Sequence, residues 1–427
     1  MSKVVLLVGA VEHRELALRT GLERGHRIVL VEEATSPLLP WAHLAVPVPD
    51  ILDARGVRAG IDRAVRLARP DGILTLYDEL FPLVAEVAAD LGLPFVDPGA
   101  ALRNANKIEQ RTALEKAGVP IPEWATCTDL ASAREAAARV GYPAILKAAD
   151  QTGSGKIRIP GPGELAAGHA RLAGARSADA PPLLVEELVH GQEYSVEAFV
   201  WHGRPTPICV THKTTTGGEY PVELGHALPY RGRDVDAVVT AALDAVRAVG
   251  VDHTLVHVEV FRTLTGPRVV EVNARSGGDY IMDLVARCGG ANPYDIVYDL
   301  SLGRAPSWHP TWRGAAAIRF LVADRAGRFA GITGVDAALA LPGFHQVGVD
   351  RQSGTPVRRP RGGEDRLGWV VADGADWRQA RDRAERIAAG LTPRIIHQLG
   401  PRISTELAAQ AEPTDGTGVD DDWEAGI

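Results

Sequence analysis

A stretch of alternating residues between positions 256 and 275 constrains the fold of this chain most. Apolar and polar residues alternate on both sides of a turn at residues 265–267, which is the pattern of a β-hairpin with one buried face. The apolar face would hold Val256, Val258, Val260, Val270, Val272 and Ala274, and the polar face would hold His257, Glu259, Glu271, Asn273 and Arg275.

The polar face of this hairpin gathers carboxylates. Opposed residues of an antiparallel pair share a face, so Glu259 lies across from Glu271 or Asn273, depending on where the turn is centred. Carboxylates in such a pair repel each other unless a cation lies between them, and Mg²⁺ accepts carboxylate and amide oxygens beside nucleotide phosphates. Arg275 would follow one strand step beyond the metal. The alternative is a solvated face with a surface ion pair, and the hairpin alone leaves both interpretations open.

The composition of the chain narrows its class. Its 427 residues are enough for about two or three domains, and a net charge of −8 disfavours a general nucleic-acid binder. No apolar run approaches the roughly 18 residues of a membrane span, and the N-terminus does not resemble an export signal. Three widely separated cysteines without metal-ligand spacing fit a reducing cytoplasm.

Residues 1–103 predict an N-terminal α/β domain with a parallel sheet. Continuous apolar strands are expected at 4–8, 28–31 and 72–76, with a short strand at 94–96 and helices at 12–24, 61–68 and 80–91. An acidic residue ends the second strand, which would suit a dinucleotide site. The first βα turn lacks G-x-G-x-x-G, however, so we disfavour NAD binding.

The next segment offers groups for a phosphate chain. A helix over 104–117 carries Lys107, and the apolar strand 144–147 ends in Lys147. The loop that follows contains Gly153, Ser154 and Gly155, whose backbone N–H groups could approach phosphates. A plain hairpin loop is the alternative, and the segment is not a P-loop because no G-x-x-x-x-G-K-[ST] motif occurs.

Three further clusters indicate binding sites. The strand ending in Glu186 and Glu187, followed by an alternating strand, suits an adenosine pocket or, alternatively, a surface hairpin. Glu223 and His226 are spaced to meet one ammonium group if their segment curls. Residues 277–278, both glycine, can present bare amides to an anion before a helix that begins near residue 280.

The order of these motifs resembles the ATP-grasp superfamily. The series is Asn106-Lys107, Ala144 to Lys147 with its Gly/Ser loop, Val185-Glu186-Glu187-Leu188-Val189-x-Gly-x-Glu193, His257-x-Glu259, and Glu271-Val272-Asn273-x-Arg275. It covers residues 104–303, and the whole layout resembles carboxylate–amine ligases. The resemblance implies an ATP-grasp fold, ATP and Mg²⁺ with Mn²⁺ as an alternative metal, small-molecule substrates without nucleic acid or membrane, and a possible homodimer.

The resemblance also implies a role for each matching position. Lys107 and Lys147 would contact phosphates and adenine. Adenine would also be bound by Glu186 and the backbone of Glu187, Leu188 and Val189, and ribose would be bound by Glu193. Magnesium would be bound by Glu259, Glu271 and Asn273, and Arg275 would stabilise the reacting carboxylate. The small-residue loop ends in Lys156, unlike commoner versions, so its phosphate contacts stay open.

Within the superfamily, the chain is most similar to L-amino-acid ligases related to the bacilysin dipeptide ligase, which act in natural-product biosynthesis. Residues 220–229 resemble a segment in which Glu223 and His226 line the substrate pocket. The segment Arg275-Ser276-Gly277-Gly278-Asp279 resembles the loop that holds a substrate carboxylate.

The implied reaction is ATP-dependent amide formation through an acyl phosphate, with Lys147, Glu259, Glu271 and Arg275 as catalytic residues. The alternatives are an ATP-grasp ligase for a peptide, a carrier-bound acyl group or bicarbonate, and a nucleotide-binding module without activity. We expect domains at 1–103, 104–303 (subdomains 104–182 and 183–303) and 304–411, the last an α+β segment, and a disordered tail at 412–427.

Overall fold

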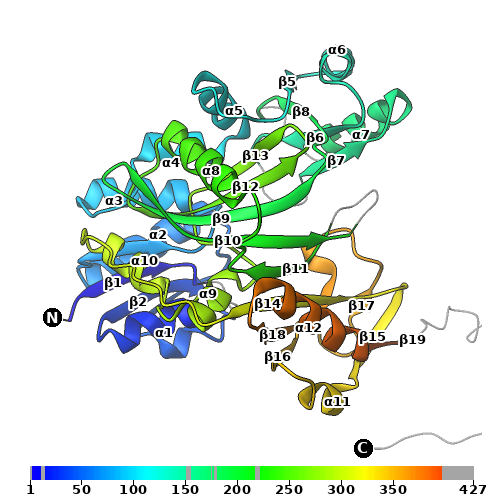
Figure 1. Cartoon of the computed structure of the whole chain (residues 1–427). Helices are drawn as coiled ribbons and strands as arrows, with labels where there is room; N and C mark the ends of the chain where they lie inside the picture. The colour runs from blue at the N-terminus through cyan, green and yellow to red at the C-terminus, as the bar shows by residue number, and fades with distance from the viewer. Residues whose placement is uncertain are drawn as a thin grey trace, which may run out of the picture.

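The computed structural model describes residues 2–10, 15–150, 155–174, 176, 180–216 and 222–396 (Figure 1). The loop residues Gly153 and Ser154 and the expected tail at 412–427 lie outside the described residues. Among the helices in the described ranges, none has the length and apolar character that a bilayer crossing needs.

The N-terminal sheet is parallel, as its apolar runs predict. Its order is β3 (Leu44–Val48), β2 (Arg27–Glu33), β1 (Val4–Val8) and β4 (Gly72–Thr75). The covering helices are α1 (Glu15–Glu23), α2 (Ala54–Leu67), α3 (Phe81–Leu91) and, from later in the chain, α10 (Tyr294–Ser301). Val5 and Leu7 pack toward α1 and α10, whereas Leu6 and Val8 pack toward α2 and α3. Both faces of the sheet are therefore buried, which accounts for continuous apolar strands.

The strands of this region differ from the expectation at two places. Sequence reasoning did not identify strand β3; Pro47 interrupts its short apolar run, and β3 is an edge strand, where proline is tolerated. Residues 94–96 form no strand. Pro94 lacks the N–H that a ladder needs, and the buried Val96 contributes to the core through its side chain alone.

The helix expected over 104–117 is interrupted at Asn106. Its side-chain Oδ1 accepts from the backbone N–H of Ile108 at 2.9 Å and of Glu109 at 3.3 Å, which makes it the N-cap of a new helix. The two helices are α4 (Pro98–Ala105) and α5 (Lys107–Lys116). The break places Lys107 in the first turn of α5.

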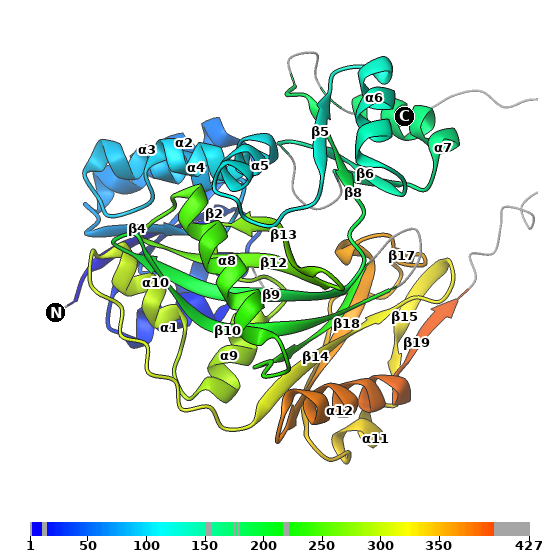
Figure 2. The same cartoon turned by 45° about the horizontal axis from the view of Figure 1, so that its top comes forward.

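A small antiparallel sheet follows, with the order β5 (Trp124–Cys127), β8 (Leu183–Glu187), β6 (Ala144–Ala148) and β7 (Lys156–Ile159). Helices α6 (Leu130–Val140) and α7 (Pro162–Gly174) pack on one face of it. Figure 2 shows this unit standing above the end of the larger sheet.

The largest sheet has eight antiparallel strands. Their order is β13 (Gly266–Asn273), β12 (Thr254–Thr263), β9 (Gln192–Trp201), β10 (Arg204–Thr215), β11 (Glu223–Leu228), β14 (Ala315–Val322), β18 (Arg366–Gly374) and β16 (Phe344–Val349). The sheet therefore runs without interruption across the expected boundary at residues 303 and 304. Outside the three sheets and their covering helices lie α11 (Val335–Leu339) and the short 3-10 helices η2 (Leu39–Trp41) and η3 (Gly363–Asp365), and a fourth, small sheet contains β15 (Gly327–Thr333), β17 (Pro356–Val357) and β19 (Thr392–Ile396).

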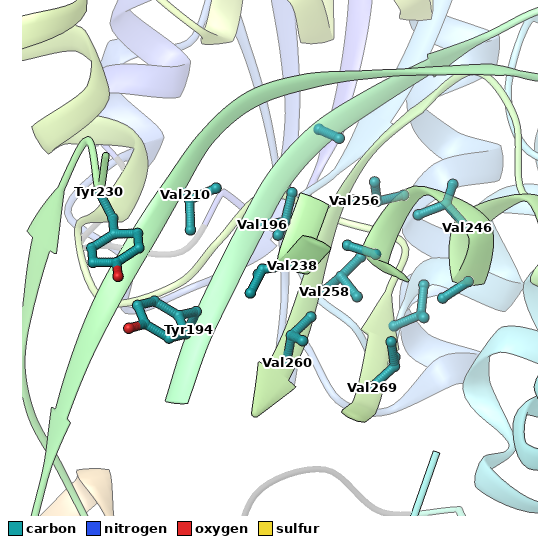
Figure 3. Packing of buried hydrophobic residues seen from close by; sticks show 14 of the residues in the cluster. Tyr194, Val196, Val210, Tyr230, Val238, Val246, Val256, Val258, Val260 and Val269 are labelled. Atoms are coloured by element: carbon teal, nitrogen blue, oxygen red, sulfur yellow. The ribbon is translucent and has the colours of Figure 1, made fainter. Parts of the chain in front are cut away.

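Helices α8 (Val235–Val249) and α12 (Trp377–Gly390) cover one face of the large sheet, and α9 (Ile281–Gly289) and α10 pack on the other. Figure 3 shows Val196, Val256 and Val258 packed beside Val238 and Val246 of α8. Because strand residues alternate between faces, Glu197, His257 and Glu259 point to the opposite face. The core under α8 thus sets the polar face on which the site is built.

Candidate active site

The register of the β12–β13 hairpin settles which polar residues oppose each other. Glu259 pairs with Glu271 and His257 pairs with Asn273, which is one of the two registers left open by the sequence. A β-bulge follows Glu259, so that Val260 pairs with Val269. Val269 is fully buried, whereas Val270 is not, so the expectation that Val270 faces the core was wrong.

The carboxylates expected to bind magnesium both carry a lysine partner. Lys107 Nζ lies 2.9 Å from Glu271 Oε1, and Lys213 Nζ donates to Glu259 Oε1 at 2.8 Å. Burial opposes the charge of Lys107, but Glu271 outweighs it and raises the pKa of that lysine. Opposed carboxylates beside Asn273 form an all-oxygen donor set that fits a hard divalent cation. The metal roles of Glu259, Glu271 and Asn273 stay predictions.

Lys213 is the centre of a buried charge cluster that sequence reasoning missed. Its Nζ donates to Glu193 at 3.0 Å, to Glu223 at 2.7 Å and to Glu259 at 2.8 Å, and the residue is only 2% exposed. Burial opposes its charge, but the three carboxylates outweigh this and raise the pKa of Lys213 well above its usual value. A lysine shortly after the apolar run Ile208, Cys209 and Val210 was the available signal. Lys213 links the expected ribose, substrate and metal positions.

The expected adenine site contains a second buried cluster. Both carboxylate oxygens of Glu186 are engaged: Arg111 Nε donates to one at 2.5 Å, and Lys147 Nζ donates to the other. Burial raises the pKa of Glu186, but Arg111 and Lys147 outweigh it and lower that pKa to about 2. Arg111 also donates to the carbonyl of Val270, so it joins the small sheet to the hairpin. Sequence reasoning assigned no role to Arg111.

The backbone expected to read the adenine edge is partly engaged within the protein. The N–H of Glu187 donates to the carbonyl of Glu123 at 2.9 Å, and the N–H of Leu188 donates to that of Pro143 at 3.2 Å. Leu188 and Val189 follow β8 and lead to β9. Of the expected phosphate loop, the described Gly155 is buried and its carbonyl accepts from the N–H of Ala148 at 2.8 Å.

Glu223 and His226 meet through a bulge and not through a curled segment. Thr214 pairs with Gly225, but Thr215 pairs with Glu223, which leaves Leu224 as the extra residue in β11. The bulge brings residues three apart onto one face, with His226 Nε2 3.4 Å from Glu223 Oε2. The expected proximity is confirmed by the geometry, and the substrate role of these residues stays a prediction.

Arg275 is joined to the N-terminal sheet. Its Nε donates to Asp78 Oδ2 at 2.6 Å, and Asp78 follows strand β4. Burial opposes the charge of Arg275, but Asp78 outweighs it and raises the pKa of the guanidinium. Sequence reasoning missed Asp78, because the pair spans 197 positions along the chain.

The loop after Arg275 packs closely on buried groups. A Cβ at Gly277 would lie 2.6 Å from Glu197 Oε2 and 3.2 Å from His257 Nδ1, so only glycine fits there without displacement. The carbonyl of Gly278 accepts from the N–H of Ile281 at 3.0 Å, where α9 begins. Whether the amides of Gly277 and Gly278 bind an anion stays a prediction.

Buried polar contacts join strand β9 to the hairpin strand β12. Glu197 Oε1 accepts from Ser195 Oγ at 2.8 Å and is 2.8 Å from His257 Nδ1, while His257 Nε2 lies 3.6 Å from Glu259 Oε1. Burial lowers the pKa of His257, but Glu197 outweighs it and raises that pKa to about 9. His257 therefore carries a proton at neutral pH.

The raised pKa of His257 predicts a pH-dependent stability. The unfolded chain releases the proton near pH 6.5 and the folded chain near pH 9, so the stabilisation is complete below about 6.5 and is lost as the pH rises through 9. We expect the free energy of unfolding to fall by roughly 3 kcal/mol over this range, measured by urea unfolding in metal-free buffer. His257→Gln should remove this pH dependence of the free energy of unfolding, and the exposed control His202→Gln should keep it. An unchanged pH dependence in His257→Gln would contradict the raised pKa of His257.

Comparisons with known proteins identify the class. The family model "ATP-grasp domain" matches residues 140–283, and "L-amino acid ligase C-terminal domain 2" matches residues 319–395. The fold is thus that of an ATP-grasp protein. More particularly, the chain carries an ATP-grasp domain followed by a C-terminal domain of the L-amino acid ligases, which confirms the resemblance seen in the sequence.

Individual relatives support this placement. The L-amino acid ligase from Bacillus licheniformis superposes with a TM-score of 0.81 at 18% identity, covering 93% of this chain and 99% of that one. Carnosine synthase 1 of Gallus gallus is 28% identical over 71% of this chain and 36% of its own length. The uncharacterized protein y4rH of Sinorhizobium fredii is 29% identical over 70% of this chain and 63% of its own. The chain thus matches less than two thirds of the length of these two curated relatives.

Proposed function

We propose that this protein activates a carboxylate, most simply that of an amino acid, as an acyl phosphate and joins it to an amine. The products would be an amide or dipeptide, ADP and phosphate. The observation that carries this proposal is the shared sheet face on which the Glu259–Glu271 pair, Lys213 and the Glu223–His226 pair follow one another. The proposed nucleotide site would thereby be connected to the proposed substrate pocket within one charge network.

The first step would be phosphorylation of the substrate carboxylate. A substrate carboxylate oxygen would attack the γ-phosphorus while the bond to ADP breaks, and Lys107 and Lys147 would neutralise phosphate charge. A divalent cation held by Glu259, Glu271 and Asn273 would supply further positive charge on the phosphates. Mg²⁺ is the proposed metal, with Mn²⁺ as a substitute.

The second step would form the amide. The amine nitrogen would attack the acyl carbon, phosphate would leave, and the nitrogen would lose a proton. Arg275, assisted by the amides of Gly277 and Gly278, would stabilise the oxyanion of the tetrahedral intermediate. Asp78 holds the Arg275 guanidinium through its Nε, so the orientation of that group does not depend on bound substrate.

The proposed reaction is tested by its products. The protein is incubated with ATP, Mg²⁺ and pairs of amino acids, and the products are separated by mass spectrometry. We expect ADP, phosphate and one amide formed with loss of water, and a hydroxamate when hydroxylamine replaces the amine, because an acyl phosphate acylates it. AMP with pyrophosphate would indicate adenylation and contradict the proposal, and bound ATP without turnover across a broad library would support a binding module.

We further propose a cytoplasmic location and a homodimer.

A further inference from the structure

A buried arginine from the C-terminal segment contacts Asp279 and Glu223 at the proposed substrate pocket. Arg366, at the start of β18, is 9% exposed and lies far along the chain from the residues that it contacts. Its Nη1 is 2.8 Å from Asp279 Oδ1, and its Nε donates to the carbonyl of Glu223 at 3.1 Å. Its guanidinium carbon lies 3.9 Å from the centre of the Phe320 ring. The side chain is therefore fixed on three sides.

Asp279 is the partner through which Arg366 acts on the site. The two oxygens of Asp279 are divided between two groups, with Oδ1 on Arg366 and Oδ2 3.4 Å from His226 Nε2. Asp279 and Tyr280 both have left-handed backbone conformations, with φ of 54° and 62°. Such conformations cost energy in residues other than glycine and persist where surrounding contacts hold them. The contacts of Asp279 with Arg366 and His226 supply that restraint.

We propose that Arg366 is a positioning residue for the amino-bearing substrate, fixing at once the loop after Arg275 and the acidic wall of the pocket. The proposal rests on the proposed function. Through Asp279, Arg366 anchors the end of the loop that begins at Arg275, and through the backbone of Glu223 it anchors the bulged strand that carries His226. The C-terminal segment would then complete the pocket.

The charges of the pocket indicate which chemical group it receives. Four carboxylates lie at the proposed substrate pocket, and within the described residues three cationic side chains are in contact with them: Lys213, Arg366 and the protonated His257, which lies 3.6 Å from Glu259. These carboxylates are Glu193, Glu223, Glu259 and Asp279. The excess of negative charge favours a substrate ammonium over a second anion. Glu223, His226 and Asp279 lie close enough to hold a metal ion together. Because Arg366 pairs with Oδ1 of Asp279, that oxygen is less accessible as a metal ligand.

Steady-state kinetics of three variants test the proposal. Arg366→Gln and Asp279→Asn should each raise the KM for the amino acid by about 10- to 100-fold, because each removes a buried charged hydrogen bond, with the KM for ATP changed less than twofold. The conservative Arg366→Lys should recover part of the loss. Because the two residues share the Arg366–Asp279 contact, the loss in the double variant should be smaller than the two single losses combined. The matched control Arg358→Gln removes an exposed arginine 3.0 Å from Asp365 and should change neither KM.

The outcomes separate this proposal from the proposed function. If the wild type forms ADP and amide but the variants alter the KM for ATP and for amino acid equally, or alter neither, the role of Arg366 is overturned while the ligase activity stands. If the wild type forms no ADP with any pair, the activity itself fails and the role of Arg366 falls with it. A divalent ion bound without ATP in the wild type and lost in Asp279→Asn would also overturn the proposal. Should Arg366→Gln not fold, Arg366→Lys and Asp279→Asn still decide.

Discussion

Replacing Glu271 with glutamine should lower ADP formation by about 1,000-fold while the protein stays folded. Glu271 lies directly opposite Glu259, and together they supply the paired carboxylates of the proposed metal site. The amide keeps the size of the side chain but removes the negative charge that would hold the cation. A coupled assay for ADP, repeated over a Mg²⁺ titration, measures the loss, and the urea unfolding midpoint measures folding.

Two controls separate the metal role of Glu271 from its ion pair. Lys107→Met removes the ammonium that is 2.9 Å from Glu271 and keeps the carboxylate, so it should weaken ATP binding without the same dependence on Mg²⁺ concentration. Glu164→Gln, on the exposed first turn of α7, should leave turnover unchanged. Wild-type turnover in Glu271→Gln would remove this residue from the metal site.

Replacing Lys213 with methionine should have the largest effect on stability, a loss of about 3–5 kcal/mol. Methionine fills a similar volume, but it leaves Glu193, Glu223 and Glu259 close together and buried without the ammonium that holds them. Turnover should also collapse, because these carboxylates span the ribose, substrate and metal positions of the proposed site. The free energy of unfolding in urea measures the first effect and the ADP assay the second.

The cost of Lys213→Met should depend on the carboxylates it leaves behind. Adding Glu193→Gln should restore part of the stability, because burial already raises the pKa of Glu193 and the amide removes its charge. The control Lys3→Met breaks an exposed pair with Asp71, whose side chains are 38% and 37% exposed, and should cost less than about 1 kcal/mol. Equal losses in the two methionine variants would show that the cluster around Lys213 contributes no more than a surface ion pair.

The parts of the site that were predictable follow from local periodicity. The alternation of residues 256–275 placed Glu259 and Glu271 on one face, and antiparallel pairing limited the registers to two. The bulge that moves Val269 into the core left no clear signal, because it depends on how β12 meets its neighbours. The same holds for the bulge at Leu224, which brings Glu223 to His226. A one-residue irregularity changes the face of a side chain without changing the apolar pattern much.

The missed residues are those whose partners lie far away in the chain. Arg111 and Glu186 are separated by 75 positions, Arg366 and Glu223 by 143, and Arg275 and Asp78 by 197. The two members of each pair lie on different strands, helices or loops, so no spacing in the sequence records the contact. Lys213 was overlooked for a related reason: its three partners become neighbours only when β9, β10, β11 and β12 are in register.

The uninterrupted eight-stranded sheet limits how this chain can be divided or recombined. Strand β11 is hydrogen-bonded to β14, so a fragment that stopped at residue 303 would expose the backbone N–H and C=O groups of β11 along a bare edge. Such an edge is a template for pairing with other molecules, and aggregation would compete with folding. The C-terminal strands thus cover the edge of the sheet that carries the candidate site. Exchange of that segment between homologues must preserve the pairing of β11 with β14.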